Sequence, residues 1–322
     1  MNSSSLGFNV SVVGRGRDSF STAVAKNVIV LALGLIINYI NGALIHTFRK
    51  HQIFYLNPRY ILFIHLVVND MIQMTLTISL FVLSYISNKI NVSLCCVILL
   101  LVVFTTLNTP INLAVMAVEC FIAICLPLRH TELCTVQRIY ILIAWMWTMS
   151  VVITMPDVFL ILATEPIELF YSTIICNKDS LFNHPVHLEK RDVSYIIYLI
   201  CVWLTLFFTY VKIFLAAKSA KSAKGSGDAK KARNTILLHG FQLLLCMLTY
   251  VAHMIHKALY YTFPENFTHV LFISYIIVQI LPRFLSPIVY GLRDKTFRQH
   301  LKKHLMCSAT SKNQTMAWSK DF

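Results

Sequence analysis

The sequence predicts an all-α membrane protein in which seven helices form a transmembrane bundle. Hydrophobic residues make up 57% of the chain and charged residues only 13%, whereas an average soluble domain has roughly 25% charged residues. The apolar residues gather in runs of about 20 or more, the length that crosses a hydrocarbon core of roughly 30 Å. These two observations indicate a multi-pass membrane protein before any motif is considered.

Seven such runs can be placed in order along the chain, at about 27–48, 58–86, 94–118, 136–160, 193–217, 234–259 and 267–290. They divide the chain into an N-terminal segment 1–26, a seven-transmembrane domain 27–290 and a tail 291–322. The N-terminal segment has no short apolar region followed by a small-residue cleavage site, so we predict no cleavable signal peptide.

The tail begins with a segment that we expect to form a short amphipathic eighth helix. Its apolar residues recur at helical spacing with basic residues between them, at Leu292, Phe297, Leu301 and Leu305. This pattern is typical of a helix that lies on the membrane surface. Membrane lipid is therefore an expected partner of this helix.

The distribution of positive charge predicts the orientation of the spans. Most of the 28 Lys and Arg residues fall in the segments 48–59, 119–138, 212–233 and 291–322, which seven spans place on one side. Positive charge concentrates on the cytoplasmic side, so we expect an extracellular N-terminus and a cytoplasmic C-terminus. The net charge of +14 reflects this bias and attraction to anionic lipid, and it does not predict nucleic-acid binding.

Glycosylation sequons agree with this orientation. Four Asn-X-Ser/Thr sites fall in segments predicted to be extracellular: Asn2, Asn9, Asn91 and Asn266. Asn313 also fits the pattern but lies in the predicted cytoplasmic tail. Sequons occur often by chance, so they support the orientation without proving it.

The most informative motif closes the third span: Met116-Ala-Val-Glu-Cys-Phe-Ile-Ala-Ile-Cys-Leu-Pro-Leu-Arg129. It resembles the segment that odorant receptors, a branch of the family A (rhodopsin-like) G-protein-coupled receptors, write as roughly MAYDRYVAICxPLRY. Cys120 stands where that family usually has arginine. The variant Glu-Cys at this place, together with Asn57–Asp70, resembles the fish-type branch of odorant receptors. The resemblance extends over nearly the whole chain.

Further stretches carry the same resemblance. The start of the sixth span resembles the odorant-receptor pattern KAxxTCxxHL through Lys231, Ala232, Thr235 and His239, with Ile236 in place of the cysteine. In the seventh span, Ser286-Pro287-Ile-Val-Tyr290 resembles the NPxxY motif, with serine replacing asparagine. The resemblance implies a role in activation or G-protein coupling for Glu119, Cys120, Phe121, Arg129, Lys231, His239, Pro287 and Tyr290.

The replacement at Cys120 changes what the motif can do. In family A receptors the arginine at this place pairs with the neighbouring acid at rest and meets the G protein when active. Cysteine supplies no cation, so Glu119 is left without that partner and could pair with a basic residue of the cytoplasmic loops instead. Coupling through other residues, a looser resting state and weak signalling are all compatible with this change.

The resemblance also implies a disulfide and a buried polar network. Family A receptors join the start of the third helix to the second extracellular loop, which here implies Cys95–Cys176; pairing of Cys96 instead, or a free Cys176, is the alternative. Asn41, Asp70 and Ser286 resemble the polar network of these receptors, in which the aspartate helps to bind sodium. A charge such as Asp70 inside a span is costly unless it is compensated. The alternative is that these groups only hydrogen-bond helices together.

The expected ligand site lies among the extracellular halves of helices three, five, six and seven. Its candidate residues are Val102, Val103, Thr106, Leu107, Tyr250, Met254, Ile276 and Gln279. Small-molecule sites are mostly apolar with a few placed polar groups, and this set fits. A single Thr or Tyr on an apolar helix is nevertheless more often a packing residue than a ligand contact.

Together these features predict an odorant receptor of the plasma membrane. It would bind a small-molecule odorant and activate a heterotrimeric G protein, most simply a stimulatory one that raises cAMP. A family A receptor for an endogenous peptide or lipid would share the core motifs and is the alternative. A transporter would show internal repeats, and an enzyme would show a metal-ligand cluster or a nucleophile–base pair; neither pattern is present in the sequence.

Overall fold

The computed structural model describes residues 19–86, 89–164, 166–174, 176, 185–223, 267–285 and 299. Six helices within these residues are long and apolar enough to cross a membrane. They are α1 (Phe20–Lys50), α2 (Pro58–Ile86), α3 (Val92–Cys125), α5 (Val136–Thr164), α8 (Pro185–Ala223) and a helix that starts as α10 (Phe267–Tyr275), passes through the π-helical turn η2 (Ile276–Ile280) and continues to residue 285.

Each of these helices coincides with one predicted span. Several are longer than the apolar run that predicted them, because a helix continues into the polar flanks where water or headgroups surround it. The predicted span 234–259 and the amphipathic helix of the tail lie outside the described residues, as do Asn2, Asn9 and Asn266.

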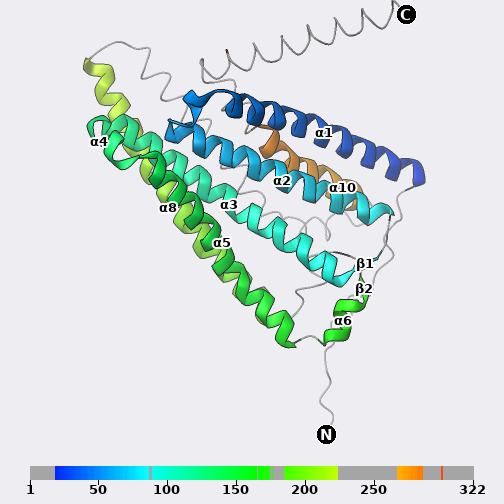
Figure 1. Ribbon diagram of the computed structural model, residues 1–322. Coiled ribbons are helices and arrows are strands. Elements are labelled where there is room, and N and C mark those ends of the chain that lie inside the picture. Colours follow the sequence, from blue (N-terminus) through cyan, green and yellow to red (C-terminus); the bar gives the residue numbers. More distant parts are fainter. Residues whose placement is uncertain are drawn as a thin grey trace, which may run out of the picture.

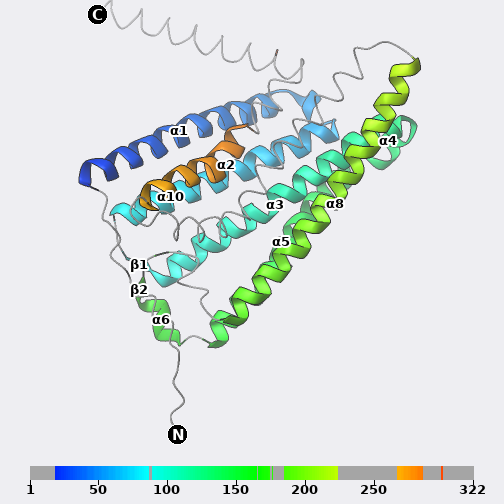
Figure 2. The same ribbon diagram turned by 180° about the vertical axis from the view of Figure 1, so that it is seen from behind.

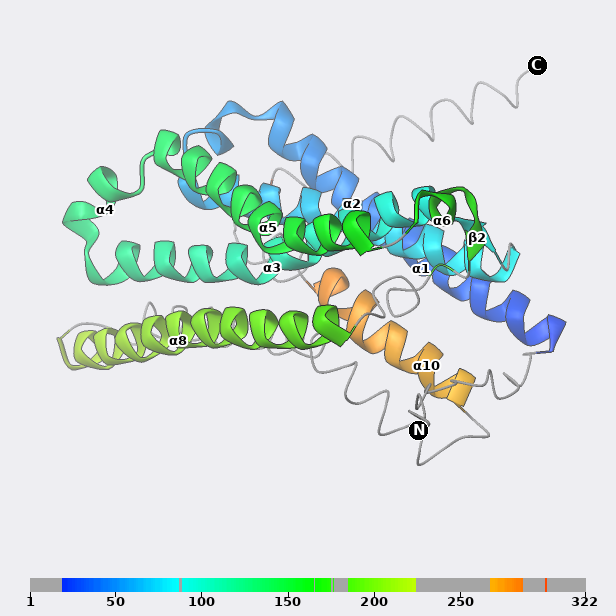
Figure 3. The same cartoon turned by 90° about the horizontal axis from the view of Figure 1, so that it is seen from below.

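Helix α3 occupies the centre of the bundle. It packs along α2 on one side and along α5 and α8 on the other (Figure 1). The helix made of α10 and η2 lies against α1 and α2 (Figure 2), and Figure 3 shows α8 and α10 on the same side of α3. The surface turned away from these contacts is apolar: Leu35 is 70% exposed, Phe207 67% and Leu204 63%.

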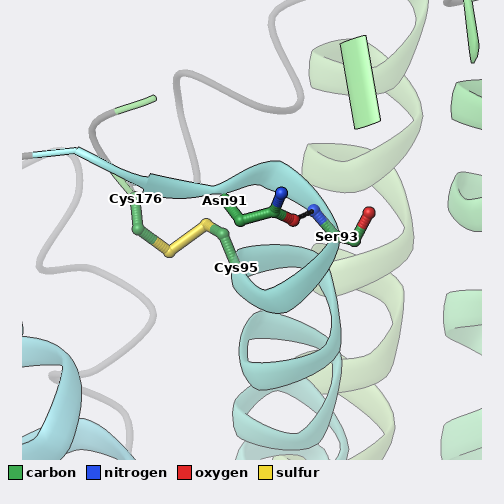
Figure 4. Close-up of a disulfide and its surroundings, with 4 residues drawn as sticks. All are labelled: Asn91, Ser93, Cys95 and Cys176. Carbon is green, nitrogen blue, oxygen red and sulfur yellow. Dashed lines mark hydrogen bonds between the residues drawn. A yellow bond between two sulfur atoms is a disulfide. The ribbon is translucent and has the colours of Figure 1, made fainter. Parts of the chain in front are cut away.

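One end of the bundle is built around a disulfide, and we call it the disulfide end. The two-residue strand β1 (Ile90–Asn91) pairs antiparallel with β2 (Thr173–Ile174), which follows the short helix α6 (Ile167–Tyr171). The side chain of Asn91 caps α3 by accepting a hydrogen bond from the Ser93 amide at 2.9 Å. Cys95, one turn into α3, is bonded to Cys176, which is the expected pairing (Figure 4).

The opposite end, where α1 and α3 finish and α2 and α5 begin, we call the Glu119 end. After α1 the chain makes a single turn, η1 (Gln52–Phe54), whose Phe54 is fully buried against Tyr60. After α3 it forms the short helix α4 (Pro127–Leu133), which starts with proline at its first position. A proline there is favourable because the first helical amide has no intrahelical partner.

Two apolar clusters fill the interior at different depths. The upper cluster, toward the disulfide end, contains Val30, Ile37, Met74, Ile78 and Ile280. The lower cluster, toward the Glu119 end, contains residues of α1, α2, α3, α5 and α8, with Leu44, Leu66, Val67 and Leu113 near its upper edge. The clusters hold the helices together by dispersion and close packing.

Buried polar residues lie between the two clusters, and we give the name polar layer to three of them, Asn41, Asp70 and Arg283. Asn41 follows Ile37 along α1, Asp70 precedes Met74 along α2, and Arg283 follows Ile280 along the last helix, each by three or four residues toward the Glu119 end. Their exposed fractions are 0%, 1% and 6%. One helical turn therefore takes each helix from the upper cluster into the polar layer.

Candidate functional site

At the Glu119 end, three side chains join α2, α3 and α4. Arg59 donates from Nε to Glu119 Oε2 at 3.1 Å, and His130 Nε2 lies 3.1 Å from Glu119 Oε1. The Glu119 side chain is only 5% exposed, whereas those of Arg59 and His130 are 42% and 26% exposed. Both carboxylate oxygens are thus engaged by basic side chains from the flanking segments, as expected for an acid beside Cys120.

Cys120 itself lies in an apolar environment. It is 6% exposed and packs with Ile213 of α8 in a small cluster that Phe121, Ile124 and Cys125 border. The Phe121 ring meets Phe208 of α8 edge-on, with ring centroids 6.2 Å apart. An uncharged side chain therefore fills the space between α3 and α8 at this depth.

Of the other residues predicted to act in coupling, the structure describes only Arg129. Arg129 is exposed on α4, beside Leu128, which is 92% exposed. Lys231, His239, Pro287 and Tyr290 lie outside the described residues. The structure therefore brings Glu119, Cys120 and Phe121 together with α8 and α4.

In the middle of α3, the candidate ligand residues differ in exposure. Val102, Val103 and Thr106 are partly buried, while Leu107 is 1% exposed. The Thr106 hydroxyl donates to the Val102 carbonyl at 2.6 Å and accepts a hydrogen bond from Gln73 Nε2 of α2. Gln73 and Thr106 therefore form a polar spot between α2 and α3, which the sequence analysis identified only on the α3 side.

The structure describes both candidate ligand residues of the last helix, Ile276 and Gln279. Ile276 packs against the upper cluster, and the side chain of Gln279 accepts a hydrogen bond from Arg283 Nη1 at 3.0 Å. Tyr250 and Met254 lie outside the described residues. Gln279 thus has a partner within its own helix, one turn away.

The expected sodium ion beside Asp70 meets an obstacle in the polar layer. Asn41 and Asp70 are buried as expected, and Ser286 lies outside the described residues. The layer, however, also contains the cationic side chain of Arg283, 6% exposed. A second cation at the same depth would be repelled in this poorly hydrated interior, so the residues present do not fit a sodium ion.

Comparisons with known proteins connect this geometry to a family. The family model described as "7 transmembrane receptor (rhodopsin family)" matches residues 40–290. Odorant receptor 131-2 of Danio rerio is 31% identical over 286 residues, covering 89% of this chain and 87% of that protein. The chain belongs to the rhodopsin family of seven-transmembrane receptors. Olfactory receptor 51B6 of Homo sapiens is 23% identical to this receptor over 193 residues, covering 57% of this chain and 59% of that protein.

The family assignment confirms several expectations. The receptor has the seven-helix fold predicted for it, is a multi-pass membrane protein and is not an enzyme. It resembles odorant receptors, as the motif at 116–129 indicated.

Three residues of these sites, Gln73, Arg283 and His130, were not singled out from the sequence. Gln73 and Arg283 were visible as polar residues inside apolar spans, and this was the signal that should have singled them out. His130 was visible as the residue after Arg129, but nothing in the spacing showed that its ring turns back to Glu119.

Proposed function

We propose that this receptor binds a small-molecule odorant within the helix bundle and activates a heterotrimeric G protein of the stimulatory class, raising cAMP. The observation that carries the proposal is the likeness to Odorant receptor 131-2, which extends over 89% of the chain. A likeness of this extent includes the ligand-facing and the coupling ends of the bundle, and not only a shared motif.

The ligand would bind in the half of the bundle near the disulfide end. The polar spot formed by Thr106 and Gln73 would orient it, and the apolar residues Val102 and Val103 of α3 would contact its hydrocarbon part. One hydrogen-bonding position in an apolar wall suits a small, weakly polar molecule. This arrangement favours an odorant over a peptide, which would need a larger and more polar surface.

The Glu119 end would face the cytoplasm and the G protein, at the plasma membrane. Two observations support this orientation: the basic residues concentrate at the Glu119 end, and the disulfide at the other end requires an oxidising compartment. Arg129 is exposed on α4, where a partner can reach it. The exposed apolar faces of α1 and α8 would contact lipid.

Activation would follow from unequal binding to two conformations. An agonist shifts the population toward a conformation only by as much as it binds that conformation more tightly. At rest, Glu119 connects α3 to the start of α2 and to α4 through Arg59 and His130. Separating these contacts would free the Glu119 end for the G protein without any contribution from a cation at position 120.

The test is a cAMP assay in cells that express the receptor with an olfactory-type stimulatory G protein. Volatile and water-soluble odorants would be screened, with surface staining of an N-terminal tag as the check on delivery. Thr106→Val should raise the half-maximal agonist concentration by about fivefold, because one hydrogen bond to the ligand is worth on the order of 1 kcal/mol. Thr148→Val is the matched control, because Thr148 is exposed on α5.

Two results would count against the proposal. A surface-positive receptor that answers no odorant but responds to peptides or lipids would favour the family A alternative. Equal shifts in Thr106→Val and Thr148→Val would place the ligand elsewhere in the bundle.

A further inference from the structure

The polar layer contains two buried side chains of opposite charge. Asp70 of α2 is 1% exposed and Arg283 of the last helix is 6% exposed. The upper and lower apolar clusters lie on either side of them. Both groups are thus separated from water, where an isolated charge is strongly unfavourable.

Asp70 lies on the face of α2 that packs against the last helix. Along α2, Asp70, Met74, Ile78 and Phe81 recur every three or four residues, which places them on one helical face. Met74 and Ile78 belong to the upper cluster, and the Phe81 ring lies 5.0 Å from the Tyr275 ring of α10. Asp70 continues this contacting face by one turn toward the Glu119 end.

Arg283 has the corresponding position on the last helix. Ile276, Ile280 and Phe284 all pack in or against the upper cluster. Arg283 is next to Phe284 and follows Ile280 by less than one turn, so it lies at the lower margin of the surface that meets α1 and α2. Its low exposure shows that its side chain points into the bundle and not toward lipid.

The two residues also lie at similar depths. The helices run in opposite directions, and the Phe81–Tyr275 contact sets their register. From that contact, Asp70 is about 16 Å and Arg283 about 12 Å toward the Glu119 end, at 1.5 Å per residue. The difference is less than one helical turn and is within the reach of an arginine side chain.

We propose that Arg283 is the internal counter-ion of Asp70, so that this receptor carries its own fixed cation where a mobile sodium ion would otherwise be required. Arginine suits the role because its guanidinium stays charged when buried and presents five N–H donors in a planar fork. The hydrogen bonds from Nη1 to the Gln279 carbonyl and side-chain oxygens hold the group against its own helix. Charge balance in the layer then depends on α2 and the last helix staying together.

A double-mutant cycle on purified full-length receptor tests the pairing. Thermal unfolding would be followed by tryptophan fluorescence for the receptor as it is, Arg283→Met, Asp70→Asn and the double variant. Each single change leaves a buried charge uncompensated and should lower the Tm by on the order of 10 °C. The double variant removes both charges, so its Tm should fall by much less than the sum of the two single-variant decreases. Arg49→Met, at an exposed arginine at the end of α1, is the control and should leave the Tm unchanged.

A salt comparison tests the second half of the proposal. In NaCl against equal KCl, the unaltered receptor should show no difference in Tm, whereas Arg283→Met should gain several degrees in NaCl because Asp70 is then open to a sodium ion. Additive losses in the cycle would overturn the proposal, and so would a sodium effect of the same size in both proteins. If Arg283→Met and the double variant both fail to fold, Arg283 acts independently of Asp70 and the proposal is wrong.

Discussion

The receptor buries a carboxylate in two regions, and the two regions compensate it differently. Glu119 is 4% exposed at one end of the bundle, and its partners Arg59 and His130 extend to solvent. Asp70 is 1% exposed in the polar layer, where Arg283 is itself almost completely buried. Near the membrane surface, long basic side chains can neutralise an acid and keep contact with water. In the centre, the compensating charge has to come from another helix.

Because their partners differ in exposure, the Glu119 contacts can break at low cost, whereas the Asp70–Arg283 pair cannot. Breaking the Glu119 contacts exposes Arg59 and His130 to water, which solvates them at little cost. Separating Asp70 from a cation in the polar layer would leave both charges between the apolar clusters. We therefore interpret the Glu119 end as the region that changes on activation and the polar layer as a fixed connection between α2 and the last helix.

Replacing the arginine by methionine in each region should give the largest difference in Tm. Arg283→Met should lower the Tm by on the order of 10 °C, whereas Arg59→Met should lower it by about 3–5 °C. The smaller loss is expected because Glu119 keeps His130 and lies close to solvent. Unfolding of the two purified variants in parallel measures the contrast. Equal losses would show that Glu119 is as isolated from water as Asp70.

Replacing Cys120 by the arginine that the family usually has should lower the stability of the receptor by an intermediate amount. Cys120→Arg places a large side chain among Ile213, Phe121 and Ile124, and overpacking of this kind costs about 1–3 kcal/mol. The new guanidinium would also reach Glu119, so Arg59→Met should cost less in the Cys120→Arg background than in the unaltered receptor. Basal cAMP should rise, because the new guanidinium competes with Arg59 and His130 for the carboxylate that connects α3 to α2 and α4 at rest.

Cys120→Met is the matched control for this change. It adds a side chain of comparable length without charge, so it should lower the Tm but leave the cost of Arg59→Met unchanged. If both backgrounds give the same cost for Arg59→Met, the new arginine does not contact Glu119.

The helix positions and the Glu119 contacts were largely predictable from the sequence. Apolar run length fixed the positions of six helices closely, because the hydrocarbon core imposes that length on every span. The motif at 116–129 showed that Glu119 could pair with a basic residue of the flanking segments, and the structure identifies Arg59 and His130. Such a partner was predictable because Cys120 has no charge and because positive residues gather at that end.

The polar layer was predictable only in part. Asn41 and Asp70 could be singled out, but Arg283 could not be assigned to a face. The π-helical turn at Ile276–Ile280 departs from the 3.6-residue period just before Arg283, so the helical pattern gives the wrong rotation for the residues that follow. The link between Gln73 and Thr106 likewise depends on how closely α2 approaches α3.

The smallest predicted loss of stability comes from removing one neutral hydrogen bond, and the losses from the charged contacts can be compared with it. Tyr198 of α8 donates a hydrogen bond from its hydroxyl to the Leu107 carbonyl of α3 at 2.6 Å, between neutral groups inside the bundle. Tyr198→Phe removes that bond with little change in shape and should cost about 0.6 kcal/mol, the average for hydrogen bonds between membrane helices, or about 1–2 °C in Tm. Tyr210→Phe, on an exposed part of α8, is the control. A loss as large as that of Arg59→Met would mean that neutral and charged contacts hold α3 equally, and that the charges at the Glu119 end are not specially suited to a switch.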